Sequence, residues 1–185
     1  RLVMDIGGGS TEFVFADGDE VKAAISLELG VVHLTEKFLK SDPPSNAELN
    51  EVVKAVVMAI SELNDLALKA SVDISEFSPE SGTLFIGTAG TVTTLSALNL
   101  AIAEYDPDII NGSVLSRSEV EGLLNRLKGI TMAERLAYVA LEKGREDLII
   151  SGTLIVLLAM RAFGFEEMTV SDAGLLEGII LESQR

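Results

Sequence analysis

The stretch VMDIGGGSTEFVFADGD, residues 3–19, places three consecutive glycines between two apolar runs. Asp5 stands before the glycines, and Ser10 and Glu12 follow them. A hairpin turn needs only one or two glycines. The third glycine therefore indicates that some other group must come unusually close to this turn.

The apolar runs around the glycines predict a sheet built from hairpins. Asp17-Gly18, within DGDE, is a second hairpin signal. The predicted strands cover residues 2–6, 11–16 and 21–29, joined by the glycines and by residues 17–20. Further along, TLFIGTAGT (83–91) predicts a short buried strand, a glycine turn and a helix that begins near Thr91, and MTVSD (168–172) predicts a last strand.

Three capping boxes mark helix starts, because in each a hydroxyl and a later glutamate satisfy each other's backbone amides. They are Ser45–Glu48, Ser116–Glu119 and Thr131–Glu134. Further helices are predicted over 30–39, over 146–163 as a largely buried helix, and over 173–183. The sequence thus predicts one α/β domain over residues 1–185. Its mixed sheet has three antiparallel hairpin-linked strands, followed by strand–helix units that favour parallel pairing, and several extra helices.

Composition excludes several kinds of site. The chain has 185 residues, a net charge of −15, no cysteine and one histidine. The charge argues against nucleic acid or an anionic membrane as a partner, and the missing residues exclude cysteine-based and multi-histidine sites. The apolar run 149–160 is too short to cross a bilayer and no signal peptide precedes the first strand, so we expect a cytoplasmic protein. A start within a strand at Arg1 predicts a piece of a longer chain.

The first glycine turn has the groups that a metal–phosphate ligand needs. Gly7, Gly8 and Gly9 can turn their backbone N–H groups outward, and Ser10 adds a hydroxyl for phosphate oxygens. At the two ends, Asp5 and Glu12 are candidate ligands for Mg²⁺. The alternative is a plain glycine-rich hairpin with incidental neighbours. An acid at both ends of the turn favours phosphate binding.

A second glycine segment, IGTAGTVTTLSAL (86–98), predicts a helix N-terminus presented to an anion. Its candidate phosphate-binding residues are Gly87, Thr88, Gly90 and Thr91. No lysine follows the last glycine, so this is not a Walker A loop. With the first turn, the segment suggests two loops that face one cleft.

These motifs resemble the exopolyphosphatase / guanosine pentaphosphate phosphohydrolase (Ppx/GppA) family of the actin-like ATPase superfamily. The family's second phosphate motif is similar to DIGGGSTEFVFADG, and the segment that follows it is similar to SLELGVVHLTEKF (26–38). The loop that holds adenosine in kinases of the superfamily resembles GTAGTVTTLSAL, and the closing motif resembles SDAGLLEGII (171–180).

The resemblance implies that this chain is the second of two RNase H-like domains, with the active site between them. The first domain, outside this sequence, would carry the general-base glutamate, so no catalytic residue is expected here. The implied substrate is polyphosphate or guanosine pentaphosphate, the implied cofactor is Mg²⁺, and the bacterial relatives often form homodimers. His33 and Leu176 stand where the family commonly has arginine, so two cations are replaced.

Other interpretations remain open. The chain can be half of an actin-like ATPase or sugar kinase, or a non-catalytic sensor of phosphorylated ligands. Arg145 and Asp147 resemble a family R-x-D stretch, but we favour a local charge pair. His33 is interpreted as a polar residue near a helix start. The acidic cluster at 17–20 lacks the spacing of an EF-hand and is interpreted as a solvated turn.

Overall fold

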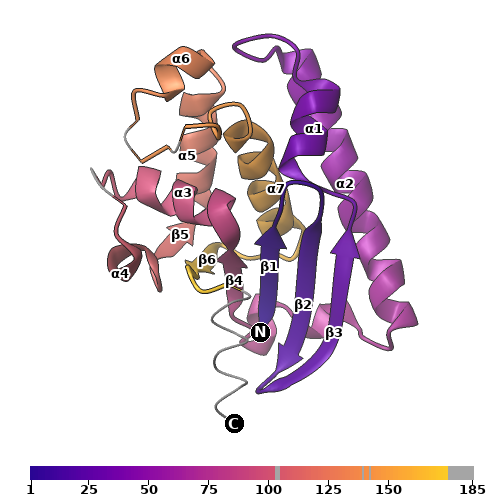
Figure 1. The fold of residues 1–185 in the computed structure, drawn as a ribbon. Coiled ribbons are helices and arrows are strands. Elements are labelled where there is room, and N and C mark those ends of the chain that lie inside the picture. Colours follow the sequence, from indigo (N-terminus) through magenta and orange to yellow (C-terminus); the bar gives the residue numbers. More distant parts are fainter. Residues whose placement is uncertain (103–104, 139, 142, 175–185) are drawn as a thin grey trace.

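The computed structural model describes residues 1–102, 105–138, 140–141 and 143–174. A six-stranded mixed sheet has the order β3-β2-β1-β4-β6-β5 (Figure 1). The strands are β1 (Leu2–Ile6), β2 (Thr11–Asp17), β3 (Glu20–Leu27), β4 (Phe85–Thr88), β5 (Val114–Ser116) and β6 (Glu167–Val170). The helices are α1 (Val31–Phe38), α2 (Asn46–Lys69), α3 (Ala89–Asn99), α4 (Pro107–Ile110), α5 (Arg117–Leu127), α6 (Met132–Arg135) and α7 (Ile149–Ala162), with two short 3-10 helices, η1 (Ile74–Glu76) and η2 (Pro79–Ser81).

The strand predictions hold for five of the six strands. β1, β2 and β3 form the expected antiparallel meander, and β4 pairs in parallel with β1 and with β6. The sixth strand, β5, is not predicted from the sequence; it has three residues and pairs antiparallel with β6 at the sheet edge. Three residues carry no measurable alternation, so only the tertiary pairing defines this strand.

The predicted helix starts are confirmed at all three capping boxes. Ser45, Ser116 and Thr131 each accept a hydrogen bond from the backbone of the glutamate three residues later, and each glutamate side chain bonds back. The buried helix begins at Ile149 rather than at 146. Residues 175–183 of the last predicted helix, including position 176, lie outside the described residues.

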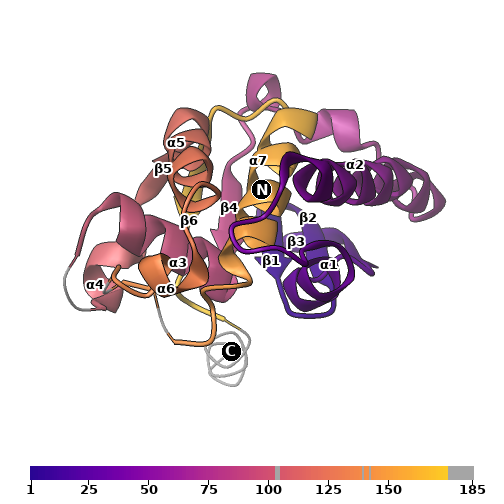
Figure 2. The same cartoon turned by 90° about the horizontal axis from the view of Figure 1, so that it is seen from above.

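The core lies on one face of the sheet. In β1, Leu2, Met4 and Ile6 are buried, whereas the residues between them are half-buried. Seen from above, α2 and α7 lie on one side of β1–β3 (Figure 2). Of the fourteen residues of α7, eleven are buried, so this helix is the centre of the core. No described helix has the length and apolar character needed to cross a membrane.

Candidate functional site

The site lies where β1 and β4 end, because these parallel neighbours bring their carboxyl ends to the same edge of the sheet. The glycine turn follows β1, and α3 follows β4. Strand pairing aligns one residue from each of four strands: Thr88 opposite Asp5, Asp5 opposite Glu12, and Glu12 opposite Ser26. Directly paired residues share a sheet face. The carboxylates of Asp5 and Glu12 therefore lie side by side, with the hydroxyl of Thr88 next to Asp5 and that of Ser26 next to Glu12.

The glycine turn is fixed against the start of α1. The Gly7 amide donates to the Ser10 carbonyl at 2.9 Å. The amides of Val31 and Val32, in the first turn of α1, donate to the carbonyls of Gly7 and Gly8 at 3.2 and 2.9 Å. The turn therefore supplies acceptors to helix amides that would otherwise lack partners.

The same arrangement leaves a row of donors. Within the described part of the chain, the amides of Gly8, Gly9 and Ser10 donate to no protein acceptor. Gly8 and Gly9 are exposed and Ser10 is half-buried. Consecutive unpaired amides are the usual backbone of an oxyanion site.

Close approach, rather than an unusual backbone conformation, explains the glycines. None of the three has φ in the left-handed region. A Cβ on Gly7 would lie 3.1 Å from the Ser10 carbonyl oxygen, and one on Gly8 would lie 3.3 Å from a methyl of Val32. A Cβ on Gly30, which precedes α1, would lie 2.1 Å from the Gly8 oxygen. Position 30 must therefore be glycine for the turn to pack against the start of α1.

The two carboxylates form a pair suited to a divalent cation. Burial, followed by the charge of Glu12, raises the pKa of Asp5. The Ser10 and Ser26 hydroxyls donate to Glu12 Oε1 at 2.6 and 2.8 Å. Hard oxygen ligands of this kind suit Mg²⁺, which keeps several waters and is commonly held by one or two carboxylates plus phosphate oxygens. The donor set therefore fits Mg²⁺. Among the described residues, no cluster of three or more acidic, histidine or cysteine side chains offers a complete protein cage.

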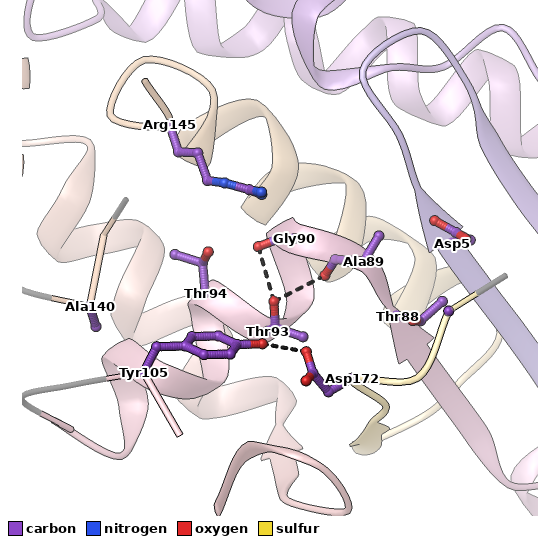
Figure 3. Close-up of a pocket in the computed structure, with 11 residues that line it drawn as sticks. Asp5, Thr88, Ala89, Gly90, Thr93, Thr94, Tyr105, Ala140, Arg145 and Asp172 are labelled. Carbon is purple, nitrogen blue, oxygen red and sulfur yellow. Dashed lines mark hydrogen bonds between the residues drawn. The ribbon is translucent and has the colours of Figure 1, made fainter. Parts of the chain in front are cut away.

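A cavity of about 280 Å³ adjoins Asp5 at the start of α3. Its polar lining comes from Asp5, Thr88, Thr93, Thr94, Tyr105, Arg145 and Asp172. Figure 3 shows the Arg145 side chain extending toward Gly90, with Tyr105 and Asp172 hydrogen bonded on another wall. A Cβ on Gly90 would lie 1.6 Å from Arg145 Nη1, so the guanidinium fills the space that a side chain there would need.

The second glycine segment is only partly at this cavity. Thr88 and Gly90 line it, as expected for residues near a ligand. Gly87 and Thr91 do not: a Cβ on Gly87 would lie 2.5 Å from Met168 Sδ, and Thr91 is buried against Gly152 of α7. These two residues pack β4 and α3 into the core, so any part that they take in phosphate binding would come from their backbone; their assignment as phosphate-binding residues stays a prediction.

Arg145 and Asp147, which the sequence analysis interprets as a local charge pair, line two different cavities. Arg145 lines the cavity with Asp5, whereas Asp147 lines a different cavity with Arg135 and contributes to that guanidinium's electrostatic environment. Tyr105 and Asp172 were not predicted either. Asp172 belongs to the stretch that resembles the closing motif, and Arg145 to the stretch that resembles R-x-D. Neither resemblance states which residues meet in this cavity.

Two minor predictions can be placed. His33 is exposed on α1, and its Cε1 would lie 3.6 Å from a Cβ on Gly9, so it borders the glycine turn. In the acidic turn, Glu20 pairs with Lys22 at 2.7 Å, and all the residues from 17 to 20 are exposed. This arrangement agrees with a solvated turn.

Comparison with known proteins gives a consistent result. The model of the Ppx/GppA phosphatase family matches residues 1–185. Exopolyphosphatase 2 of Mycobacterium tuberculosis is 34% identical over 184 residues, which are 97% of this chain and 54% of that protein. The guanosine-5'-triphosphate,3'-diphosphate pyrophosphatase of Vibrio cholerae is 26% identical, over 98% of this chain and 33% of its own length. The solved PPX-GPPA enzyme of Aquifex aeolicus superposes with a TM-score of 0.85 at 33% identity, over 98% of this chain and 56% of that one. The chain thus spans about half the length of the first of these relatives and a third of the second.

Proposed function

The chain belongs to the Ppx/GppA phosphatase family, and we propose that the full-length protein hydrolyses terminal phosphoanhydride bonds. The substrate would be polyphosphate, releasing orthophosphate, or guanosine pentaphosphate, giving the tetraphosphate. This chain would be the second domain and would supply one wall of the site. Its relatives' lengths support a further domain, which would carry the general-base glutamate.

The observation that carries the proposal is the combination of two features: three amides, at Gly8, Gly9 and Ser10, that donate to no acceptor among the described residues, and the Asp5–Glu12 pair. The amides would bind the oxygens of the terminal phosphoryl group, and the carboxylates would hold Mg²⁺. When bound, the cation neutralises charge on the phosphates. The chain's own residues then position the phosphoryl group for attack by water, and positioning with charge stabilisation accounts for most of the rate in phosphoryl transfer.

The cavity beside Asp5 extends this arrangement along the substrate. Arg145 and the start of α3 would contact phosphates beyond the terminal one. Function in the cytoplasm is proposed from the sequence pattern, and function as a homodimer from the family resemblance alone.

Orthophosphate release by the full-length protein tests the proposal, with Mg²⁺ and with polyphosphate, guanosine pentaphosphate and ATP compared side by side. Gly8→Val should abolish release, because a branched side chain covers the amides. Gly129→Val is the matched control, since a Cβ there meets nothing closer than 3.8 Å. Selectivity for ATP would favour an ATPase or kinase. Binding without release would favour a sensor. Rapid turnover by the 185-residue chain alone would refute the view that it is one wall of a shared site.

A further inference from the structure

Besides Ser10, a residue of β3 also hydrogen bonds to the carboxylate of Glu12, and the proposed function gives that residue no role. Ser26 donates to Glu12 Oε1 at 2.8 Å, and strand pairing places the two residues directly opposite each other. Building on the proposed function, we infer that Ser26 is a positioning residue: it holds one oxygen of Glu12 so that the other stays available for the cation.

The hydrogen bonds divide the two oxygens of Glu12 into different roles. Oε1 accepts from Ser10 at 2.6 Å and from Ser26 at 2.8 Å. Two hydroxyls use both lone pairs of that oxygen. Within the described part of the chain, Oε2 accepts no hydrogen bond. Glu12 can therefore offer a cation one oxygen, directly or through a water, and cannot bind it through both.

Ser10 and Ser26 are not equivalent holders. Ser10 lies at the end of the glycine turn, and its hydroxyl has a single proton, which it gives to Glu12. A phosphate oxygen at the turn would compete for that proton. Ser26 lies within β3, paired along its length with β2, and away from the free amides. Ser26 would therefore keep Glu12 in place when Ser10 turns to the phosphate.

This role differs from that of an ordinary polar residue on an edge strand. β3 is an outer strand and Ser26 is exposed, so a serine there could serve only to keep the strand hydrated. In that case its removal would change neither cation affinity nor activity. A hydrogen bond to a ligating carboxylate commonly changes metal affinity by about 10-fold or more when it is removed.

The test is a titration of the 185-residue chain with Mn²⁺, in place of Mg²⁺, followed by electron paramagnetic resonance in the presence of tripolyphosphate. Ser26→Ala should weaken Mn²⁺ binding by about 10-fold, and Ser26→Thr, which keeps a hydroxyl and suits a strand, should restore it. Ser61→Ala on α2 is the matched control, because among the described residues its hydroxyl bonds only to the carbonyl of Met58. Each variant should still unfold cooperatively, as the wild type does, so that a change in Mn²⁺ affinity reports on the site and not on the fold.

In the full-length protein, Ser26→Ala should raise the Mg²⁺ concentration for half-maximal phosphate release while kcat at saturating Mg²⁺ is preserved. Wild-type Mn²⁺ affinity in Ser26→Ala would overturn the inference. Absence of any Mn²⁺ binding by the wild-type chain would overturn it as well. The hydrolase proposal would then still be decided by phosphate release from the full-length protein, so the two failures are distinguishable.

Discussion

Gly30→Ala is the change that most sharply tests how the glycine turn is held. The backbone of Gly30, with φ −111° and ψ 151°, is one that alanine adopts freely. Any effect must therefore be steric. The new Cβ would lie 2.1 Å from the Gly8 oxygen and 2.3 Å from the Gly9 carbonyl carbon, where ordinary contact begins at 3.4 Å. The obstacle is backbone, which cannot rotate away.

The turn must therefore move off α1 by more than about 1 Å, which breaks the hydrogen bonds from Val31 and Val32. Each bond contributes about 1 kcal/mol, and overpacking adds about 1–3 kcal/mol. We expect the free energy of unfolding to fall by about 3–5 kcal/mol, measured by urea denaturation. The displaced turn should also lose its affinity for tripolyphosphate.

Gly122→Ala is the control for this experiment. Gly122 lies in the exposed surface of α5, and a Cβ there meets nothing within 4 Å. The same substitution should stabilise the chain by about 0.5–1 kcal/mol, because alanine is the better helix former. A loss below about 1 kcal/mol in Gly30→Ala, or unchanged tripolyphosphate binding, would refute the packing argument.

Three further outcomes follow from the contacts. Asp5→Asn should raise the stability of the metal-free chain by about 0.2–1 kcal/mol, since it removes one of two like charges that face each other. Mg²⁺ should raise the thermal unfolding temperature of the wild type and should not raise that of this variant. Arg135→Met should cost about 3 kcal/mol or more in urea denaturation, because the Arg135 side chain is 2% exposed and donates to the carbonyls of Leu127, Ile130 and Glu146. Each buried carbonyl left without its donor costs about 1–3 kcal/mol. Hydrogen bonds, first from the Ser116 side chain, lower the pKa of Glu119 from its ordinary 4.5. The stability that these bonds give is complete above pH 4.5 and is lost as the pH falls through the lowered pKa. Ser116→Ala should therefore reduce the free energy of unfolding by about 1 kcal/mol near pH 7 and by less in acid, as measured by unfolding curves across pH.

Local signals explain what the sequence predicted correctly. The capping box at Ser116 and the hairpin at Asp17-Gly18 need only residues within four positions of each other, and both are present in the structure. The paired acids of the glycine turn were visible because Asp5 and Glu12 lie symmetrically about a short hairpin.

Long-range contacts explain what the sequence did not show. Arg145 meets Gly90 across 55 positions of the chain, and no spacing rule connects them. Ser26 becomes relevant only once the register of β2 and β3 places it opposite Glu12. Gly87 and Thr91 share a motif with Thr88 and Gly90, yet they point into the core, because strand alternation and helix packing divide neighbours between two sides.

The central claim is that the first glycine turn of this chain binds a phosphate oxyanion through its backbone. An amide-resolved NMR titration of the chain with tripolyphosphate and Mg²⁺ tests it most directly. The account predicts that the amides of Gly8, Gly9 and Ser10 shift together and saturate at one ligand concentration, and that Gly8→Val removes the response. Shifts confined to other amides, with these three unmoved, would contradict it.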